Sequence, residues 1–494
     1  MFLLGFDVGS SSIKASIVDV AKNVSVDTVK FPEHELTIHA PKFGWAEQDP
    51  ELWWTNLCEA TKKLLTRNPG INPSAILGIG ISYQMHGLVL IDKHQKVLRP
   101  SIIWCDSRAV DIGDKAFGEI GEKKCLEHFL NSPGNFTASK LKWVMENEPE
   151  IYSNTDKVLL PGDFISMKMT GEINTTITGL SEGIFWDFKK NGKANLLLEH
   201  FGIDDSKMAE AVPSLQVHGT LTESAANELG LKSGTPVTYK AGDQPNNAMT
   251  LNALEPGEIA ATGGTSGVIF AVTDQAIYDP ESRVNAFAHV NHTTGNSRIG
   301  ILMCINGCGI QYNWVRKNLA GGNSSYEKME QEAAKIPVGS DGLVILPFGN
   351  GAERIFNNKE IGAQFLNVNL NRHSDAHFYR AALEGIAFSF VYGTEILSDI
   401  GISAQVIRVG NDNLFQSEIF SSTIASITGC PIEMYETTGA IGAARAAGVS
   451  LGLYNSIQEA FASNQLSKTY LPVQNPNNYQ EAFTRWKDGL NKFL

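Results

Sequence analysis

Apolar and polar residues alternate at the start of the chain in a way that predicts two short β-strands. Apolar side chains at alternate positions of residues 2–8 would share one face of the first strand, and those of residues 13–17 one face of the second. A short polar segment separates the strands, so we expect a hairpin. The pattern returns near the midpoint, where residues 258–260 lead into a small-residue segment and residues 268–272 lead out of it.

The two hairpin turns consist of small residues. Glycine, serine and threonine leave backbone N–H groups and hydroxyls free to approach a phosphate, and a nearby carboxylate can face a Mg²⁺ ion. Either turn alone is an ordinary tight hairpin, but two turns in separate halves of a chain can hold a polyphosphate from both sides. The first turn, residues 9–12, contains Gly9, Ser10, Ser11 and Ser12 after Asp7, and the second turn, residues 263–267, contains Gly263, Gly264 and Thr265.

Neither turn matches the two commonest nucleotide motifs. The chain has no Gly-x-x-x-x-Gly-Lys-Ser/Thr loop, and neither turn has the Gly-x-Gly-x-x-Gly spacing, followed by a helix, that a dinucleotide site requires. The sequence therefore disfavours hydride transfer and leaves a phosphate clamp of another kind.

The length and charge of the chain limit its organisation and partners. A chain of 494 residues is too long for one core, so we expect two α/β domains, residues 1–245 and 246–494. The formal charge of −13 opposes non-specific nucleic-acid binding. No apolar run is long enough to span a bilayer and no leader is evident, so we expect no membrane association and a cytoplasmic location. The oligomeric state stays open, with a homodimer as one alternative.

Several later segments place polar residues directly after predicted strands, where ligands commonly bind. The strand at 75–81 opens into residues 82–87, and the strand at 236–241 runs into a glycine, a carboxylate and several amides at 242–247. Helices are expected from about residues 50 and 374 and over 439–448. Residues 105–230 are expected to be mainly helical, and within them residues 170–195 a surface insertion without a chemical role. Leu52, Leu57, Thr61 and Leu65 would face inward from the helix that starts at Pro50.

Taken together and in order, these segments resemble the FGGY family of carbohydrate kinases, within the actin-like ATPase superfamily. The resemblance spans nearly the whole chain. It implies two ribonuclease H-like domains, each a mixed sheet flanked by helices, with ATP and sugar in the cleft between them. The segments that carry it are 6–14, 45–50, 84–87, 104–108, 242–244, 263–267 and 439–445.

The resemblance also implies a role for individual residues. Asp243 would be the catalytic base, and Asp7 would act on Mg-ATP and contact Mg²⁺, directly or through water. The sugar site would comprise Gln84, Met85, His86, Trp104, Asp243 and Gln244, and the ATP site Gly9, Ser10, Ser11, Ser12, Gly263, Gly264, Thr265, Gly410 and Asn413.

The implied substrates are ATP and a ketopentose. Residues 84–86 stand where glycerol kinases carry an Arg-Glu pair, which favours a ketose, and D-xylulose phosphorylated on its 5-hydroxyl is the first choice. L-Ribulose, gluconate and glycerol are alternatives. A non-catalytic, ATP-gated module of the actin type is a further alternative. On their own environments Asp243 could be only a helix cap and His86 an ordinary core histidine.

Overall fold

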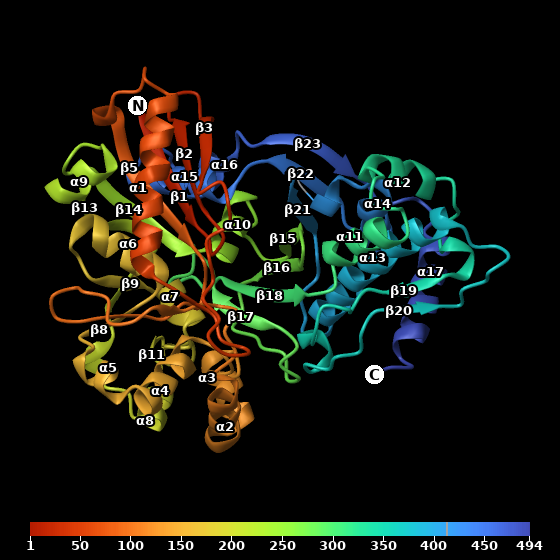
Figure 1. Cartoon of the computed structure of the whole chain (residues 1–494), viewed down its shortest axis with the longest axis horizontal. Helices are drawn as coiled ribbons and strands as arrows, with labels where there is room; N and C mark the ends of the chain where they lie inside the picture. The colour runs from red at the N-terminus through yellow and green to blue at the C-terminus, as the bar shows by residue number, and fades with distance from the viewer. Residues whose placement is uncertain (412) are drawn as a thin grey trace.

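The computed structural model describes residues 1–411 and 413–494, which form two mixed sheets flanked by helices (Figure 1). This confirms the expected α/β fold with two such units. The first sheet has the order β13 (Leu215–Thr220), β14 (Pro236–Gly242), β5 (Ile76–Tyr83), β1 (Phe2–Val8), β2 (Ile13–Asp19) and β3 (Val24–Phe31). The second has the order β17 (Asn285–Ala288), β18 (Ile299–Ile305), β16 (Gly267–Thr273), β15 (Glu258–Gly263), β21 (Val406–Gly410), β22 (Ile432–Glu436) and β23 (Gln465–Tyr470).

The two sheets share one plan. In each, an antiparallel hairpin, β1–β2 or β15–β16, is paired through its first strand with a parallel neighbour, β5 or β21. The predicted hairpins are therefore present, with the two small-residue turns at their tips. No helix in the described part of the chain is long and apolar enough to cross a membrane.

Helices cover both faces of the first sheet. Helix α1 (Pro50–Arg67) begins after the capping residue Asp49 and packs on β2 and β3, whereas α15 (Gly439–Ser450) packs on β1 and β5. Because neighbouring strand residues point to opposite faces, Leu4 packs with the α1 cluster and Leu3 with the α15 cluster. The expected inward position of Leu52 was wrong: its side chain is 49% exposed. The buried side chains Trp53 and Trp54 follow it instead.

The segment 170–195 was expected to be a surface insertion, and this expectation was wrong. Helix α7 (Ile177–Glu182) lies within it, and every residue from Thr178 to Phe188 is buried. The hydroxyl of Ser181 accepts a hydrogen bond from the Ala288 N–H in β17, an edge strand of the second sheet. The segment therefore joins the two halves of the molecule.

Most helices of the second half lie to the right of the second sheet in Figure 1. Helix α10 follows β14 directly and packs against α15. Helix α15, which consists mostly of small residues, belongs to the second half of the chain but packs on the first sheet. The main helices of this half are α10 (Asp243–Thr250), α11 (Gly309–Asn318), α12 (Tyr326–Ala333), α13 (Asp375–Asp399), α14 (Glu418–Thr428), α15 and α17 (Asn477–Leu490).

Two strand glycines allow α15 to lie directly on the first sheet. A Cβ atom at Gly80 would lie 1.9 Å from the Ala443 carbonyl oxygen, and one at Gly5 would lie 2.0 Å from the Ala440 carbonyl oxygen. Both distances are shorter than the 3.0 Å below which real Cβ atoms essentially never approach another atom. The backbone of α15 thus lies directly against Gly5 and Gly80 of the first sheet.

Replacing Gly80 by alanine is expected to destabilise the protein by about 3 kcal/mol or more, because the obstacle is helix backbone and cannot rotate away. Gly118→Ala in α2 (Val110–Ile120) is the control. No atom lies within 4 Å of its added Cβ, so it is expected to be neutral or stabilising by up to about 1 kcal/mol. Thermal unfolding of both variants measures this, and equal melting temperatures would contradict the packing described.

Candidate active site

Three parallel strands of the first sheet end side by side. Val8 at the end of β1 pairs with Tyr83 of β5, and Tyr83 also pairs with Gly242 of β14. The first turn, the loop after β5 and the start of α10 therefore leave the sheet at one edge. This register brings together the segments that carry Asp7, His86 and Asp243, which are far apart in the sequence.

Asp7 lies at this edge with its side chain 19% exposed. The hydroxyl of Ser82 donates to Asp7 Oδ1 at 3.0 Å, and Lys14 Nζ lies 3.7 Å from Oδ2. A Cβ atom at Gly439 would lie 3.1 Å from Asp7 Oδ2, so the carboxylate faces the N-terminus of α15. The positive end of the helix dipole favours an anion there.

Hydrogen bonds within the first turn, and from Gln48 and Trp104, hold the turn in place. The Gly9 N–H donates to the Ser12 carbonyl at 3.1 Å, and Gln48 Nε2 donates to the Ser10 carbonyl at 2.7 Å. Trp104 Nε1 lies 3.4 Å from the Ser10 hydroxyl, with its indole ring 53% exposed. Ser11 is exposed and Ser12 is buried. Trp104 therefore lies beside the first turn.

The second turn borders a cavity of about 770 Å³, which is large enough for a nucleotide. The Gly264 and Thr265 carbonyls accept hydrogen bonds from the N–H groups of Gly309 and Ile310 at the start of α11. Gly263, Gly264 and Thr265 all line the cavity. These three predicted residues therefore share one site.

The other residues that line this cavity were not predicted from the sequence. Tyr312 and Tyr326 stack at 5.5 Å between ring centroids, and Asn313, Glu327 and Gln416 also line the space. They come from α11, α12 and η5 (Asn413–Gln416), and no motif marks them.

The two residues expected to contact adenosine lie on β21 and η5. Gly410 ends β21 and is not among the residues that line the cavity; the described residues nearby that do are Leu414, Gln416 and Ser417. Asn413 begins η5, but its side chain lies outside what the structure describes.

Asp243 is the first residue of α10 and its carboxyl group is partly buried. Burial raises its pKa to about 7, helped by the negative charge of Asp7, against the lowering effects of Gln244 and Lys14. The two carboxylates are therefore electrostatic neighbours, and the Asp243 carboxyl group exchanges its proton near neutral pH. That is the property required of a general base.

The loop after β5 has a buried and an accessible part. Gln84 and Met85 are 2% and 4% exposed; Gln84 Nε2 lies 3.3 Å from Gln48 Oε1, and Met85 lies against Gly242. His86 is partly exposed and adopts a left-handed backbone with φ of 62°. Gln244 is partly exposed next to Asp243. Of this predicted sugar set, His86, Trp104, Asp243 and Gln244 have accessible surface.

Known proteins match this chain over nearly its full length. Residues 2–250 match the N-terminal domain of the FGGY family of carbohydrate kinases, and residues 259–451 match its C-terminal domain. The chain belongs to this family. It is therefore a carbohydrate kinase, whose phosphate donor in this family is ATP.

Individual relatives agree with this assignment. The xylulose kinase of Escherichia coli strain K12 is 28% identical over 473 residues, covering 95% of this chain and 94% of the relative. The crystal structure of xylulose kinase from Rhodospirillum rubrum superposes with a TM-score of 0.88 at 26% identity, covering 100% and 99% of the two chains. The gluconate kinase of Lactobacillus acidophilus shares the fold, with a TM-score of 0.89 at 24% identity over 99% and 98%. The fold alone thus does not choose the sugar.

This FGGY kinase has carboxylates that suit a nucleotide-bound metal ion. Among the described residues, no cluster of three or more His, Cys, Asp or Glu side chains could enclose a metal ion. Mg²⁺ bound to nucleotide phosphates takes only one or two protein carboxylates and otherwise keeps water. The partly exposed Asp7, with Asp243 nearby, fits that requirement.

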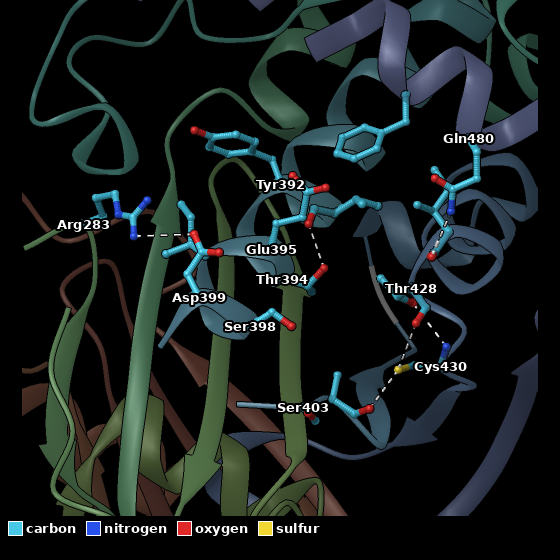
Figure 2. A pocket seen from close by; sticks show the side chains of 15 residues that line it. Arg283, Tyr392, Thr394, Glu395, Ser398, Asp399, Ser403, Thr428, Cys430 and Gln480 are labelled. Carbon is cyan, nitrogen blue, oxygen red and sulfur yellow. Dashed lines mark hydrogen bonds and ion pairs between the residues drawn. The ribbon is translucent and has the colours of Figure 1, made fainter. Parts of the chain in front are cut away.

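A second cavity of about 580 Å³ lies among α13, α14 and α17, away from both turns (Figure 2). Several of its polar groups already have partners within the chain. The hydroxyl of Thr394 donates to the Val391 carbonyl, and Glu395 pairs with Lys487. Arg283 lies 3.8 Å from Asp399 (Figure 2). We assign this cavity no role in the kinase.

Substituting Asp243 by asparagine is expected to stabilise this kinase above pH 7. A carboxyl group whose folded pKa is about 7, against an ordinary 3.8, holds a proton that the unfolded chain releases between these values. Stability contributed by the neutral carboxyl is lost as the pH rises through 7, and asparagine avoids this loss. The variant's advantage should grow from about pH 4 to pH 7, to at most about 4 kcal/mol, and then level off.

Thermal unfolding at several pH values measures the effect. Asp375→Asn is the matched control, because Asp375 is also the first residue of a helix, α13, but is exposed. A pH-independent loss of stability in Asp243→Asn would identify Asp243 as a simple helix-stabilising residue instead.

Proposed function

We propose that this kinase transfers the γ-phosphate of ATP to the 5-hydroxyl of D-xylulose, with Asp243 as the general base. The observation that carries the mechanism is a carboxyl group with a pKa of about 7 beside Asp7, at the sheet edge from which the first turn emerges. The choice of sugar is supported by the relatives named xylulose kinase and by the loop that contains Met85 and His86.

Asp243 would remove the proton of the sugar hydroxyl as the oxygen bonds to phosphorus. General-base assistance contributes about 10²- to 10⁴-fold to the rate, or roughly 3 to 5 kcal/mol of the barrier. A pKa near 7 leaves much of the carboxyl group ionised at neutral pH and still basic enough to accept the proton. The remaining acceleration comes from positioning and from charge stabilisation.

The two turns would hold the phosphates from opposite halves of the chain. The first turn lies beside Asp7, and Gly263, Gly264 and Thr265 line the larger cavity, so their backbone groups can approach the β- and γ-phosphates. Mg²⁺, when bound with ATP near Asp7, would neutralise charge on the phosphate oxygens. Asp7 itself would orient the nucleotide and raise the basicity of Asp243.

The test of this function is ADP release across a panel of ketoses, polyols and aldonates. D-Xylulose is expected to stimulate release most strongly, with L-ribulose, gluconate and glycerol as comparisons. If only another sugar stimulates release, that sugar is the substrate instead of D-xylulose, and the proposed mechanism still applies. ATP turnover that no sugar changes would contradict a sugar kinase and favour an ATP-gated module.

Asp243→Asn is expected to lower kcat by at least about 10²-fold while ATP affinity changes little, because the amide cannot accept the proton. Steady-state kinetics and calorimetric ATP titration measure the two effects. In the wild-type enzyme, kcat/KM for the sugar should fall about tenfold per pH unit below about pH 7. Retained turnover in the variant would show that another residue is the general base. Asp375→Asn controls for a general effect of removing a helix N-terminal charge.

Asp7→Asn is expected to weaken Mg-ATP binding and turnover together, by about tenfold or more, because the amide is a poor ligand for Mg²⁺. The asparagine can still accept the hydrogen bond from Ser82, so the turn should keep its shape. Rates measured over a magnesium titration test this. An unaltered magnesium dependence would show that Asp7 does not contact the metal ion, either directly or through water.

A further inference from the structure

Glu182 and Lys140 make three hydrogen bonds to His86, and Lys140 makes a fourth to Ile103. The His86 N–H donates to Glu182 Oε1 at 3.3 Å, and His86 Nδ1 lies 2.9 Å from the Glu182 carbonyl oxygen. Lys140 Nζ donates to the carbonyl oxygens of His86 and of Ile103, both at 3.0 Å. The side chains of Glu182 and Lys140 are both fully buried.

We propose that Glu182 and Lys140 are positioning residues that hold His86 as a neutral imidazole whose Nε2 accepts a hydrogen bond from a sugar hydroxyl. The proposal rests on the proposed sugar-kinase function and deepens it. It makes His86 a residue that recognises a hydrogen-bond donor, and it explains how the protein keeps the ring in that form.

The tautomer follows from the partner of Nδ1. A backbone carbonyl oxygen can only accept a hydrogen bond, so Nδ1 must carry the proton. In a neutral imidazole the other ring nitrogen is then a bare acceptor. Among the described residues, Nε2 has no hydrogen-bond partner, and the residue is partly exposed. A ligand hydroxyl can therefore donate to it.

The surroundings of the ring oppose a positive charge. The Phe136 ring lies 4.9 Å from the imidazole, edge to face, and the Phe287 ring of the second sheet lies 5.4 Å away. Burial, with the positive charges of Lys140 on α4 (Thr137–Asn147) and Arg354 on η4 (Arg354–Phe356), lowers the pKa of His86 to about 3. Burial also raises the pKa of Glu182 on α7, which disfavours a negative charge beside the ring. The ring therefore stays uncharged at neutral pH.

The same contacts hold a strained backbone. A non-glycine residue at φ of 62° is unfavourable on its own, by about 1 kcal/mol or more, so the hydrogen bonds to its N–H and carbonyl must stabilise it. Lys140 also fixes the carbonyl of Ile103, next to Trp104. The Lys140 side chain thus connects the two loops that carry His86 and Trp104.

The chemical consequence is selectivity for a hydroxyl group. A carbon that carries a hydroxyl can donate to Nε2, whereas a deoxy or keto carbon at the same position leaves the acceptor unpaired. An unpaired polar group in such a site reduces kcat/KM by about 10- to 100-fold. One hydroxyl position of the substrate should therefore be far more sensitive to deletion in the wild-type enzyme than in His86→Leu.

The tautomer can be tested without substrate. Nitrogen NMR of the full-length protein with ¹⁵N-labelled histidine, assigned by comparison with His86→Gln, should show one histidine protonated on Nδ1 and unchanged between about pH 5.5 and pH 8. A His86 signal that titrates in this range, or that carries its proton on Nε2, would overturn the proposal.

The positioning role is tested with the sugar that supports ADP release. Lys140→Met and Glu182→Leu should each raise KM for the sugar at least about tenfold and leave KM for ATP within about twofold. Glu182→Gln keeps an oxygen acceptor for the His86 N–H and should restore most of the sugar affinity. Equal losses for sugar and ATP, or no rescue by glutamine, would make these residues merely structural. Failure of every sugar would instead contradict the proposed function, while the NMR result would still stand on its own.

Discussion

The site depends on one constraint, the common register of three parallel strands. Val8, Tyr83 and Gly242 are neighbours across β1, β5 and β14, so the chain leaves the first sheet at the same level three times. One exit forms the first turn, one the loop with His86, and one the start of α10 with Asp243. A one-residue slip of β14 would turn its side chains to the opposite face and carry Asp243 away from Asp7.

The sequence predicted the parts of this arrangement that follow from local patterns. Alternation gave the hairpins at 2–17 and 258–272, and polar residues after strands marked His86 and Asp243. Long-range packing could not be predicted in this way. Residues 170–195 have the polar, glycine-rich composition of a surface loop, yet they bury Glu182 beneath His86. The cavity lined by Tyr312 and Tyr326 depends on how α11 and α12 lie beside the second turn, and no spacing records that.

Two opposite electrostatic effects operate within one site. Burial of Asp243, with the negative charge of Asp7 nearby, makes its carboxyl group harder to ionise and correspondingly more basic. His86 is enclosed by aromatic rings and lies near Lys140, so it does not gain a proton at neutral pH. The first group is prepared to accept a proton and the second to accept a hydrogen bond. Both conditions cost stability and are typical of functional sites rather than of cores.

The most direct test of this account is a crystal structure with D-xylulose, Mg²⁺ and a non-hydrolysable ATP analogue. The predicted result places an Asp243 carboxylate oxygen within about 2.6–3.2 Å of the hydroxyl that faces the γ-phosphate, with the two turns on either side of the phosphates. The account would be contradicted if the reactive hydroxyl lay beside another basic side chain and the Asp243 carboxylate did not face the sugar.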